Sequence, residues 1–329
     1  MSNNRRRRRR TFITESNDDK LNAGMPGFNS MEIIDCQDRF IDALKTRNLS
    51  TDTLKFYRQQ IRSLILALES QDIPTKVDVI THDIMERNFI AYSLNELGVK
   101  YSTVAIRLRG LRAFFNWLVE RSIIPESPMK DIVINNKNRN TIETYSREQV
   151  RELFRQPDLE TFVGYRDYAI LTVFIETGVR LRELTDIKVE DVRMADSQIL
   201  IHGKSGEDRL VPFQRQAERV LKRYLKARGE SPVPYLFVTE DDRQMSRKAV
   251  QERVAKYGRM SNITNVRNSP HTFRHTFAKM SVQNGANIFD LQKILGHSTL
   301  EMVRVYVNMF SGEVAESHRK FSPLENLHR

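Results

Sequence analysis

Residues 269–275 read Ser-Pro-His-Thr-Phe-Arg-His and open a helix that the sequence predicts from about His271 to Asn284. His271 and Arg274 are three residues apart, so they share one face of that helix. Their polar groups can converge there on a single anion. Another face carries apolar side chains at helical spacing, namely Phe273, Phe277 and Met280. The helix is therefore predicted to bury one side and to present chemistry on the other.

A tyrosine follows on a separate predicted element. A helix is predicted from Ile288 to Leu295, and residues 298–301 (Ser-Thr-Leu-Glu) form a capping-box pattern that starts the next one. That helix carries Tyr306. A tyrosine among valines is usually packed in a core with its hydroxyl hydrogen-bonded, so Tyr306 alone identifies nothing. Together with the histidines and the arginine upstream, it indicates phosphoryl transfer onto a tyrosine.

A metal site is the competing interpretation of the same histidines. His271 and His275 are four residues apart, but Arg274 between them is a permanent cation. The sequence offers no Cys partner and no H-E-x-x-H pattern, so we predict no metal ligand and no cofactor. A P-loop is not expected either, because Gln198 stands where the first glycine of G-x-x-x-x-G-K-[ST] belongs.

A second cluster of polar residues lies at 176–184 (Glu-Thr-Gly-Val-Arg-Leu-Arg-Glu-Leu). Gly178 ends an apolar helix predicted from Tyr165 to Ile175, and Arg180 starts the next short helix. Glu183 follows at i, i+3, a spacing at which a carboxylate can orient a guanidinium. An arginine after a glycine is also common at a solvated helix start. The cluster therefore indicates a functional site only in combination with the histidine-rich helix.

Two strands are predicted from Gln198 to His202 and from Arg209 to Phe213, around a turn at residues 203–208 (Gly-Lys-Ser-Gly-Glu-Asp). Lys204 lies at the tip of this hairpin. A lysine in a turn is usually just solvent exposed. With the helices on either side, the hairpin predicts a fold that is mainly α with a small antiparallel β-sheet.

In type and in order, these residues resemble the catalytic set of the tyrosine recombinase (phage integrase) family. Residues 177–184 match the family's T-G-x-R-x-x-E-L segment, and residues 271–274 match its H-x-x-R. The separations 204 − 180 = 24 and 306 − 297 = 9 are similar to those of Xer-type members. The resemblance implies that the catalytic residues are Arg180, Lys204, His271, Arg274, His297 and Tyr306, with Glu183 orienting the cationic side chains.

The chemistry that this set implies is attack on a phosphodiester. Arg180 and Arg274 would hold the non-bridging oxygens and stabilise the charge of the transition state, and His297 would add a hydrogen bond. Tyrosine, with an unperturbed pKa of about 10, needs a proton acceptor, for which His271 is the candidate base. Lys204 is the candidate acid for the departing 5′-oxygen, although its hairpin is more acidic than the family's G-K-G-x-K-x-R pattern.

Length and charge fit a two-domain protein with a polyanionic partner: the chain has 329 residues and a formal net charge of +11. The charge is uneven, because residues 11–144 hold 17 Lys and Arg against 18 Asp and Glu, a net charge of 17 − 18 = −1.

Following the resemblance, we divide the chain into a basic disordered tail (1–30), a helical SAM-like core-binding domain (31–130), a linker (131–144) and an α+β tyrosine recombinase catalytic domain with a C-terminal tail (145–329).

Four helices are predicted in the core-binding domain, at Met31–Lys45, Thr51–Ser70, Thr81–Leu97 and Ser102–Arg121. The last sets arginines opposite an apolar stripe and resembles the last helix of the family's core-binding domain. An ordinary amphipathic helix with a solvated charged face gives the same pattern. The candidate DNA-binding residues are Lys55, Arg58, Arg62, Arg107, Arg109 and Arg112.

The resemblance implies a site-specific DNA recombinase, a DNA strand transferase that works through a 3′-phosphotyrosine intermediate and a Holliday junction without ATP or metal. Its expected partners are double-stranded DNA at a specific site, three further copies in a synaptic homotetramer, and accessory proteins. Two alternatives stay open. One is a type IB topoisomerase-like enzyme that relaxes supercoils, and the other is a catalytically idle DNA-binding protein.

The remaining features concern compartment and tails. The single Cys36 excludes an intramolecular disulfide, and neither a signal peptide nor a membrane span is expected, so we predict a cytoplasmic, nucleoid-associated protein. The run from Arg5 to Arg10 is either a phosphate-binding arm or an unimportant tail. By family resemblance, the tail from Phe310 to Arg329 docks on a neighbouring protomer.

Overall fold

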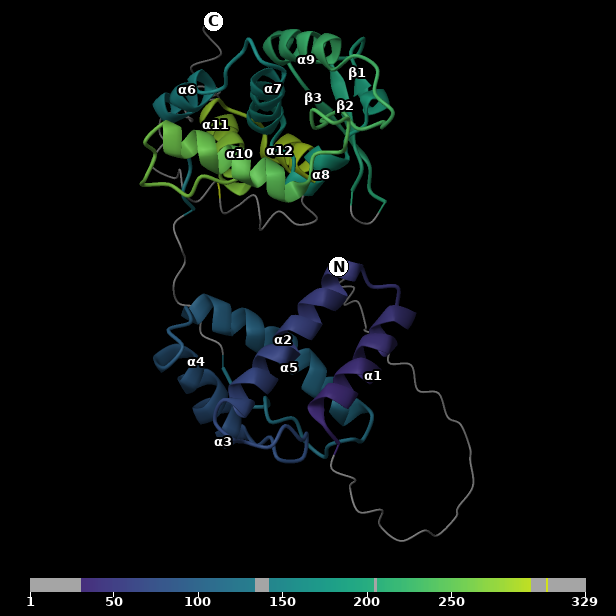
Figure 1. Cartoon of the computed structure of the whole chain (residues 1–329), viewed down its shortest axis with the longest axis vertical. Helices are drawn as coiled ribbons and strands as arrows, with labels where there is room; N and C mark the ends of the chain where they lie inside the picture. Colours follow the sequence, from purple (N-terminus) through teal and green to yellow (C-terminus); the bar gives the residue numbers. More distant parts are fainter. Residues whose placement is uncertain (1–30, 134–141, 204–205, 297–305, 307–329) are drawn as a thin grey trace, which may run out of the picture. The chain divides into compact units, whose positions relative to one another are not determined.

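The computed structural model describes residues 31–133, 142–203, 206–296 and 306, and Figure 1 traces the chain. The chain divides into two compact units, residues 1–139 and residues 140–329. Each unit has a hydrophobic core of its own, so each is described by itself. The predicted tail at residues 1–30 and most of the predicted linker lie outside the described residues.

The N-terminal unit is built from helices. Its elements are α1 (Ile33–Thr46), α2 (Thr51–Glu69), α3 (His82–Ile84), the π-helix η1 (Met85–Ala91), α4 (Tyr92–Asn95) and α5 (Tyr101–Glu120). The helices predicted around α1, α2 and α5 are confirmed. The segment predicted as one helix from Thr81 to Leu97 is helical over most of its length, but its middle is a π-helix instead of a continuous α-helix.

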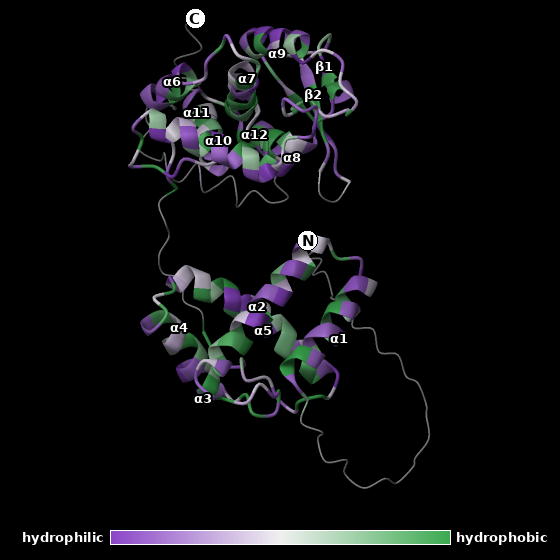
Figure 2. Cartoon of the chain, viewed as in Figure 1, coloured by the Kyte–Doolittle hydropathy of each residue, from purple (hydrophilic) through white to green (hydrophobic). Residues whose placement is uncertain are grey.

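Aromatic rings fill the core of the N-terminal unit. The ring of Phe40 on α1 lies 5.5 Å from the rings of Phe114 and Trp117 on α5. Helices α2 and α5 approach closely at Gly110, where an added Cβ would lie 2.7 Å from Cγ of Gln60. Only glycine permits that approach without a shift of Gln60. Figure 2 shows polar and apolar residues alternating along these helices, as expected of helices that bury one face.

The C-terminal unit combines helices with a small sheet. Its elements are α6 (Arg147–Arg155), α7 (Phe162–Thr177), α8 (Leu181–Asp186), the 3-10 helix η2 (Val189–Asp191), β1 (Val192–Arg193), β2 (Gln198–Ile201), β3 (Arg209–Pro212), α9 (Arg215–Arg228), α10 (Arg247–Met260), α11 (Pro270–Gln283) and α12 (Ile288–Leu295). The strand order is β1-β2-β3, and both pairs are antiparallel. The predicted fold class, mainly α with a small antiparallel sheet, is confirmed.

Strands β2 and β3 form the predicted hairpin. Ile199 lies opposite Val211, and Ile201 lies opposite Arg209. The three apolar side chains of these pairs are buried, so one face of the hairpin packs on the core of the unit. Each strand ends one residue before its predicted end. This register places Arg209 at the start of β3, beside the helices that carry the site.

Helix α7 is the central element of the C-terminal unit. Most of its residues are buried, and it packs against both α9 and α11 (Figure 1). A helix that is apolar on nearly every side belongs in the middle of a fold. The helix ends at Thr177, and Gly178 follows in a left-handed conformation with φ of +62°, which glycine adopts without strain. The predicted helix end at Gly178 is confirmed.

Two further findings apply to the part of the chain that the structure describes. None of its helices is long and apolar enough to cross a membrane. Its His, Cys, Asp and Glu side chains form no group of three or more that could hold a metal ion. Cys36, the one cysteine of the sequence, is buried in α1.

Candidate active site

Arg180 is the N-cap residue of α8, two residues after Gly178. The carboxylate of Glu183 accepts two hydrogen bonds from Arg180, one from the backbone N–H and one from Nη1, each 2.8 Å long. A carboxylate in the first turn satisfies a free N–H group and suits the positive end of the helix dipole. The predicted i, i+3 pair is therefore present. Because 38% of the Arg180 side chain stays exposed, its guanidinium remains accessible to a ligand.

Glu183 also binds Arg209, the first residue of β3. Nη2 and Nη1 of Arg209 donate to its two carboxylate oxygens at 2.7 and 3.1 Å, and Nε donates to the carbonyl of Ile294 on α12 at 2.7 Å. Burial raises the pKa of Glu183, but the hydrogen bonds from Arg209 and Arg180 outweigh burial and lower that pKa to about 2. The carboxylate is therefore ionised at neutral pH and ties α8 to β3, while Arg209 ties β3 to α12.

Arg274 on α11 is buried, with 5% of its surface exposed. Its Nη1 donates to the carbonyl of Gly178 at 2.7 Å, and its Nη2 donates to the carbonyl of Leu295 at 2.8 Å. Both carbonyls stand at helix C-termini, where the helix dipole favours a cation. Burial lowers the pKa of Arg274 to about 10, and nearby Arg180 contributes. The guanidinium therefore stays charged at neutral pH and is held by the ends of α7 and α12.

His271 and Arg274, three residues apart on α11, differ in exposure. His271 is exposed, whereas Arg274, one turn later, is buried. The difference arises because the carbonyl groups that end α7 and α12 bind the guanidinium. Although His271 reaches the surface, the protein atoms around its ring partly desolvate it and lower its pKa, and the charges of Arg274, Arg267 and Arg180 lower that pKa further. The histidine and the two arginines of the predicted set therefore lie near one another.

Tyr306 is buried, with 4% of its surface exposed. It belongs to a small apolar cluster whose other buried members are Ala278, Leu291 and Leu295. Its hydroxyl oxygen lies 2.7 Å from Nδ1 of His275 on α11. Burial raises the pKa of Tyr306, and the charges of Arg274 and Arg180 act in the opposite direction. The phenol is therefore protonated at neutral pH, and it stands in the field of two guanidinium groups.

The structure thus brings together five of the seven residues that the sequence predicts for the active site. The residues that lie near one another are Arg180, Glu183, His271, Arg274 and Tyr306. Lys204, His297 and the predicted capping box at residues 298–301 lie outside the described residues. The start of α11 is as predicted, because the side chain of Ser269 caps it and Pro270 is its first residue.

Two residues of this site received no role from the sequence. Arg209 corresponds to the last residue of the family's G-K-G-x-K-x-R pattern. Its fixed position directly after the turn is a signal from which a role in the site could have been predicted. His275 was considered only as a metal ligand. It contacts a tyrosine 31 positions away, and no local pattern predicts that pairing.

Known proteins share this organisation. Residues 143–312 match the phage integrase family, and residues 37–124 match the phage integrase N-terminal SAM-like domain. The chain belongs to the phage integrase family. This tyrosine recombinase is 30% identical over 292 residues to the tyrosine recombinase XerD of Shewanella oneidensis, which covers 87% of this chain and 96% of the relative. It is 32% identical over 290 residues to the tyrosine recombinase XerC of Syntrophus aciditrophicus, which covers 84% and 92% respectively.

Solved structures share the fold of this tyrosine recombinase. The Tn1549 transposon integrase in complex with transposon right end DNA matches with a TM-score of 0.71 at 18% identity, covering 88% of this chain and 99% of that one. The XerH site-specific recombinase bound to a palindromic difH substrate matches with a TM-score of 0.70 at 18% identity, covering 87% and 84%. The fold is a helical SAM-like domain and an α+β catalytic domain, and family membership makes the chain a DNA strand-transferring enzyme.

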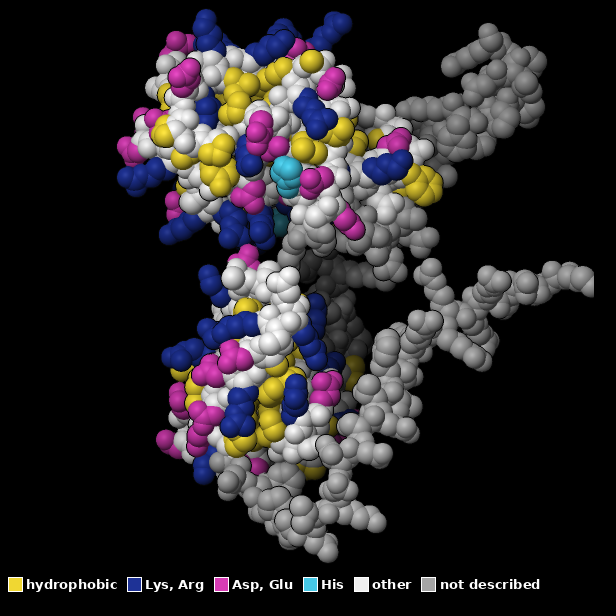
Figure 3. Space-filling model, turned by 90° about the vertical axis from the view of Figure 1, so that its right-hand side faces the viewer, with side chains coloured by type: hydrophobic (Ala, Val, Ile, Leu, Met, Phe, Trp, Pro, Cys, Tyr) yellow, Lys and Arg dark blue, Asp and Glu magenta, His cyan; other side chains and the backbone are white. Residues whose placement is uncertain are grey.

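The candidate DNA-binding residues of the tyrosine recombinase lie on α2 and α5. The exposed ones are Lys55, Arg58, Arg62 and Arg109, whereas Arg107 is half-buried. Arg112 was expected to project outward, but it is half-buried and Nη2 donates to the carbonyl of Ile132. Figure 3 shows the Lys and Arg side chains of this unit lying among Asp and Glu on the face in view.

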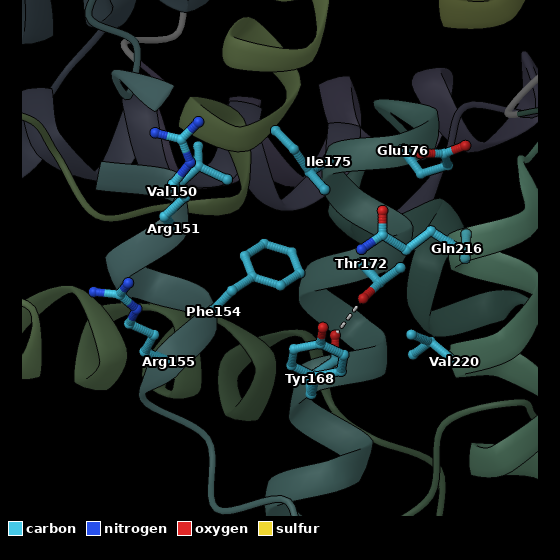
Figure 4. Close-up of a pocket in the computed structure, with 11 residues that line it drawn as sticks. Val150, Arg151, Phe154, Arg155, Tyr168, Thr172, Ile175, Glu176, Gln216 and Val220 are labelled. Carbon is cyan, nitrogen blue, oxygen red and sulfur yellow. Dashed lines mark hydrogen bonds between the residues drawn. The ribbon is translucent and has the colours of Figure 1, made fainter. Parts of the chain in front are cut away.

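A cavity of about 480 Å³ opens between α6, α7 and α9 of the tyrosine recombinase (Figure 4). Its apolar lining comes from all three helices and consists of Val150, Phe154, Tyr168, Ile175, Ala217 and Val220. The hydroxyl of Thr172 in this lining donates to the backbone carbonyl of Tyr168 at 2.8 Å. The lining shares no residue with the cluster around Arg180, so the cavity is separate from the candidate active site.

Proposed function

We propose that this tyrosine recombinase is a site-specific recombinase that cleaves and rejoins DNA through a covalent 3′-phosphotyrosine at Tyr306 and a Holliday junction. The observation that carries the proposal is the position of the Tyr306 hydroxyl in the field of Arg180 and Arg274. Guanidinium groups suit the geometry of phosphate oxygens. A tyrosine oxygen in the field of two such groups supports a role in attack on phosphorus.

Arg180 and Arg274 hold the non-bridging oxygens of the scissile phosphate in this proposal. Each guanidinium is already fixed, Arg180 by Glu183 and Arg274 by the carbonyls of Gly178 and Leu295. Fixed cations need little reorganisation when negative charge develops in the pentacovalent transition state. A preorganised donor of this kind contributes roughly 10² to 10³ in rate.

The other residues of the predicted set complete the proposed chemistry. Lys204 protonates the departing 5′-oxygen, and His271 and His297 donate hydrogen bonds to the phosphate. Glu183 keeps Arg180 and its neighbour on β3 in place. Because the tyrosine–phosphate link conserves the energy of the broken phosphodiester, the reaction requires neither ATP nor a metal ion.

The proposed substrate is double-stranded DNA at a specific site, recombined by a homotetramer in the synaptic complex and with accessory proteins. The formal net charge of +11 supports a polyanionic partner. Proteins with the same fold also support a DNA substrate. The structure of XerH was solved in a post-cleavage complex with a difH substrate, and that of a λ integrase dimer was solved bound to a COC′ core site. We place the enzyme in the cytoplasm with the nucleoid.

Covalent trapping on nicked DNA tests the proposal. The DNA is a duplex with a site that the protein itself selects from a random library, nicked so that the cleaved fragment diffuses away. Wild-type protein is expected to give a slow band on a denaturing gel, and Tyr306→Phe is expected to bind the duplex without giving the band. Tyr168→Phe is the matched control, because it removes a hydroxyl from the separate cavity lining.

The two alternatives predict different results. Wild-type protein that binds the selected site but yields no covalent band would belong to the catalytically idle class. A covalent band and relaxation of supercoiled plasmid, without exchange between two labelled duplexes, would indicate a type IB topoisomerase-like enzyme. Exchange products with a Holliday junction on a native gel are the result that the proposal requires.

A further inference from the structure

The Tyr306 hydroxyl faces a histidine to which the proposed function gives no role. Its oxygen lies 2.7 Å from Nδ1 of His275, and the two ring centroids are 5.7 Å apart at an interplanar angle of 48°. This separation is that of a well-formed hydrogen bond. His275 follows Arg274 directly on α11 and lies one turn after His271. The oxygen that would attack phosphorus is thus already paired with an imidazole nitrogen.

The groups around this contact determine its charge. Burial lowers the pKa of His275, and His271 and Arg274 on the same helix lower it further. Burial raises the pKa of Tyr306 opposite, against the charges of Arg274 and Arg180. At neutral pH the contact therefore joins a neutral imidazole to a protonated phenol. A neutral imidazole has one nitrogen with a free lone pair, which can accept the phenol proton.

We propose that His275 is the proton acceptor for Tyr306 during strand cleavage. As the bond from the tyrosine oxygen to phosphorus forms, the O–H bond breaks and its proton moves to Nδ1. The bond from phosphorus to the 5′-oxygen breaks in the same step, and that oxygen takes a proton from the acid, Lys204. Rejoining runs in reverse, with the 5′-hydroxyl attacking phosphorus and His275 returning the proton to tyrosine. The inference rests on the proposed function and names the base within that site.

This assignment differs from the hypothesis drawn from the sequence, which gave the base to His271. A general base lies within about 2.6–3.2 Å of the atom whose proton it removes, and Nδ1 of His275 meets that requirement. His271 is exposed and close to the charges of Arg180 and Arg274. That position suits a hydrogen bond to the phosphate. The two histidines, four residues apart on one helix, therefore have different roles in the same step.

The pH dependence of covalent complex formation on the nicked duplex tests the assignment. The wild-type rate is expected to rise with pH through the pKa of His275, because only the neutral imidazole accepts a proton. His275→Gln keeps a side-chain acceptor but takes up no proton in this pH range. Its rate is expected to fall about 10²-fold or more and to lose the rise. His271→Gln is the matched variant and is expected to react more slowly but to keep the rise.

The outcomes separate the inference from the function on which it rests. A His275→Gln enzyme that keeps the pH rise, or a His271→Gln enzyme that loses it, would overturn the assignment to His275. A wild-type enzyme that forms no covalent complex, or a Tyr306→Phe variant that still forms one, would instead overturn the proposed function.

A measurement on the free wild-type protein covers the case in which His275→Gln does not fold. Nitrogen-15 NMR of the histidine side chains is expected to show an unprotonated Nδ1 on His275 at neutral pH. That resonance is expected to shift in Tyr306→Phe, which removes the hydrogen-bond donor. A protonated Nδ1, or an Nδ1 resonance of His275 that does not shift in Tyr306→Phe, would contradict the inference.

Discussion

Arg209 on β3 donates two hydrogen bonds to the carboxylate of Glu183 on α8, at 2.7 and 3.1 Å. The same carboxylate accepts two from Arg180, so its buried charge is compensated on both oxygens. The contact joins a strand to a helix and holds one of the proposed phosphate-binding arginines in place. Arg209 is therefore a positioning residue for Arg180, acting through Glu183.

Glu183→Gln is expected to lower the free energy of unfolding of the C-terminal unit by about 3 kcal/mol, because it leaves the largely buried guanidinium of Arg209 and the partly exposed one of Arg180 without their counter-charge. Urea denaturation at pH 7 measures the change. Glu190→Gln is the control, since Glu190 forms an exposed ion pair with Lys188, and such pairs contribute about 0–1 kcal/mol. Equal stability of the two variants would contradict the role given to Glu183.

The ionised carboxylate of Glu183 also predicts that the free energy of unfolding depends on pH under acidic conditions. The pKa of Glu183 falls from 4.5 to about 2 in the folded protein, so its contribution to stability is present above pH 4.5 and is lost as the pH falls toward 2. The difference in unfolding free energy between wild type and Glu183→Gln is therefore expected to be constant above pH 5 and to shrink below it. Urea titrations at pH 7, 5 and 3 measure this difference. A difference at pH 3 as large as that at pH 7 would count against the assignment.

The local parts of the site follow from sequence patterns. Gly178 after an apolar run predicts the end of α7, and the i, i+3 spacing predicts the pair of Arg180 and Glu183. Ser269 before a proline predicts the start of α11, where its side chain accepts a hydrogen bond from the N–H of Thr272. Each of these contacts spans one helical turn at most, so neighbouring residues contain all the information needed.

The remaining contacts depend on where separate helices end in space. Arg274 is buried because the carbonyls of Gly178 and Leu295 meet at its guanidinium, and no periodicity encodes that meeting. His275 and Tyr306 pair for the same reason. Arg112, expected to project outward, instead donates a hydrogen bond to the carbonyl of Ile132, which lies 20 positions further along the chain.

Gly178→Ala is expected to destabilise the C-terminal unit by about 1–3 kcal/mol and to reduce strand cleavage. Gly178 has a φ of +62°, and an added Cβ would lie 2.3 Å from Cδ1 of Phe277, so backbone strain and steric overlap combine. Because the Gly178 carbonyl binds Arg274, any shift also moves a proposed phosphate-binding group. Thermal melting and covalent trapping measure the two effects.

Gly285→Ala is the matched control for that variant. Gly285 also has a positive φ, +85°, but an added Cβ would meet nothing within 4 Å. The control is expected to show backbone strain alone and to keep cleavage. Equal losses of melting temperature and of cleavage in both variants would show that the overlap with Phe277 plays no part.

His202 bridges two carboxylates at the base of the β2–β3 hairpin. Nδ1 lies 2.8 Å from Oδ2 of Asp208, and Nε2 lies 3.2 Å from Oδ1 of Asp191. The hydrogen bond with Asp208, assisted by Asp191, raises the pKa of His202 above 6.5. A raised pKa in the folded state means that the bridge contributes fully below pH 6.5 and is lost as the pH rises through the folded value.

Hydrogen exchange of the amides of Ile201 and Arg209, which pair across the hairpin, measures that loss. Protection factors, corrected for intrinsic exchange, are expected to fall with rising pH in the wild type. In His202→Gln they are expected to be lower below pH 6.5 and independent of pH. Wild-type protection that stays constant from pH 6 to 9 would mean that the bridge does not hold the hairpin.

Arg274→Lys is expected to lose most strand cleavage while the C-terminal unit stays folded. An ammonium group can still donate to the carbonyls of Gly178 and Leu295, but it lacks the planar fork that binds two phosphate oxygens at once. The rate of covalent complex formation is expected to fall about 10²-fold or more. The free energy of unfolding is expected to fall by only about 1–3 kcal/mol, the cost of the hydrogen bonds lost.

Arg166→Lys separates the effect on chemistry from the effect of burying a lysine. Arg166 is as buried as Arg274, with 4% exposed against 5%, and it donates to the carbonyl of Val238 at 3.1 Å. Both variants are expected to lose comparable stability in urea, and only Arg274→Lys is expected to lose cleavage in single-turnover trapping. If both lost cleavage equally, the loss would come from a weakened unit, and Arg274 would not be the phosphate-binding group.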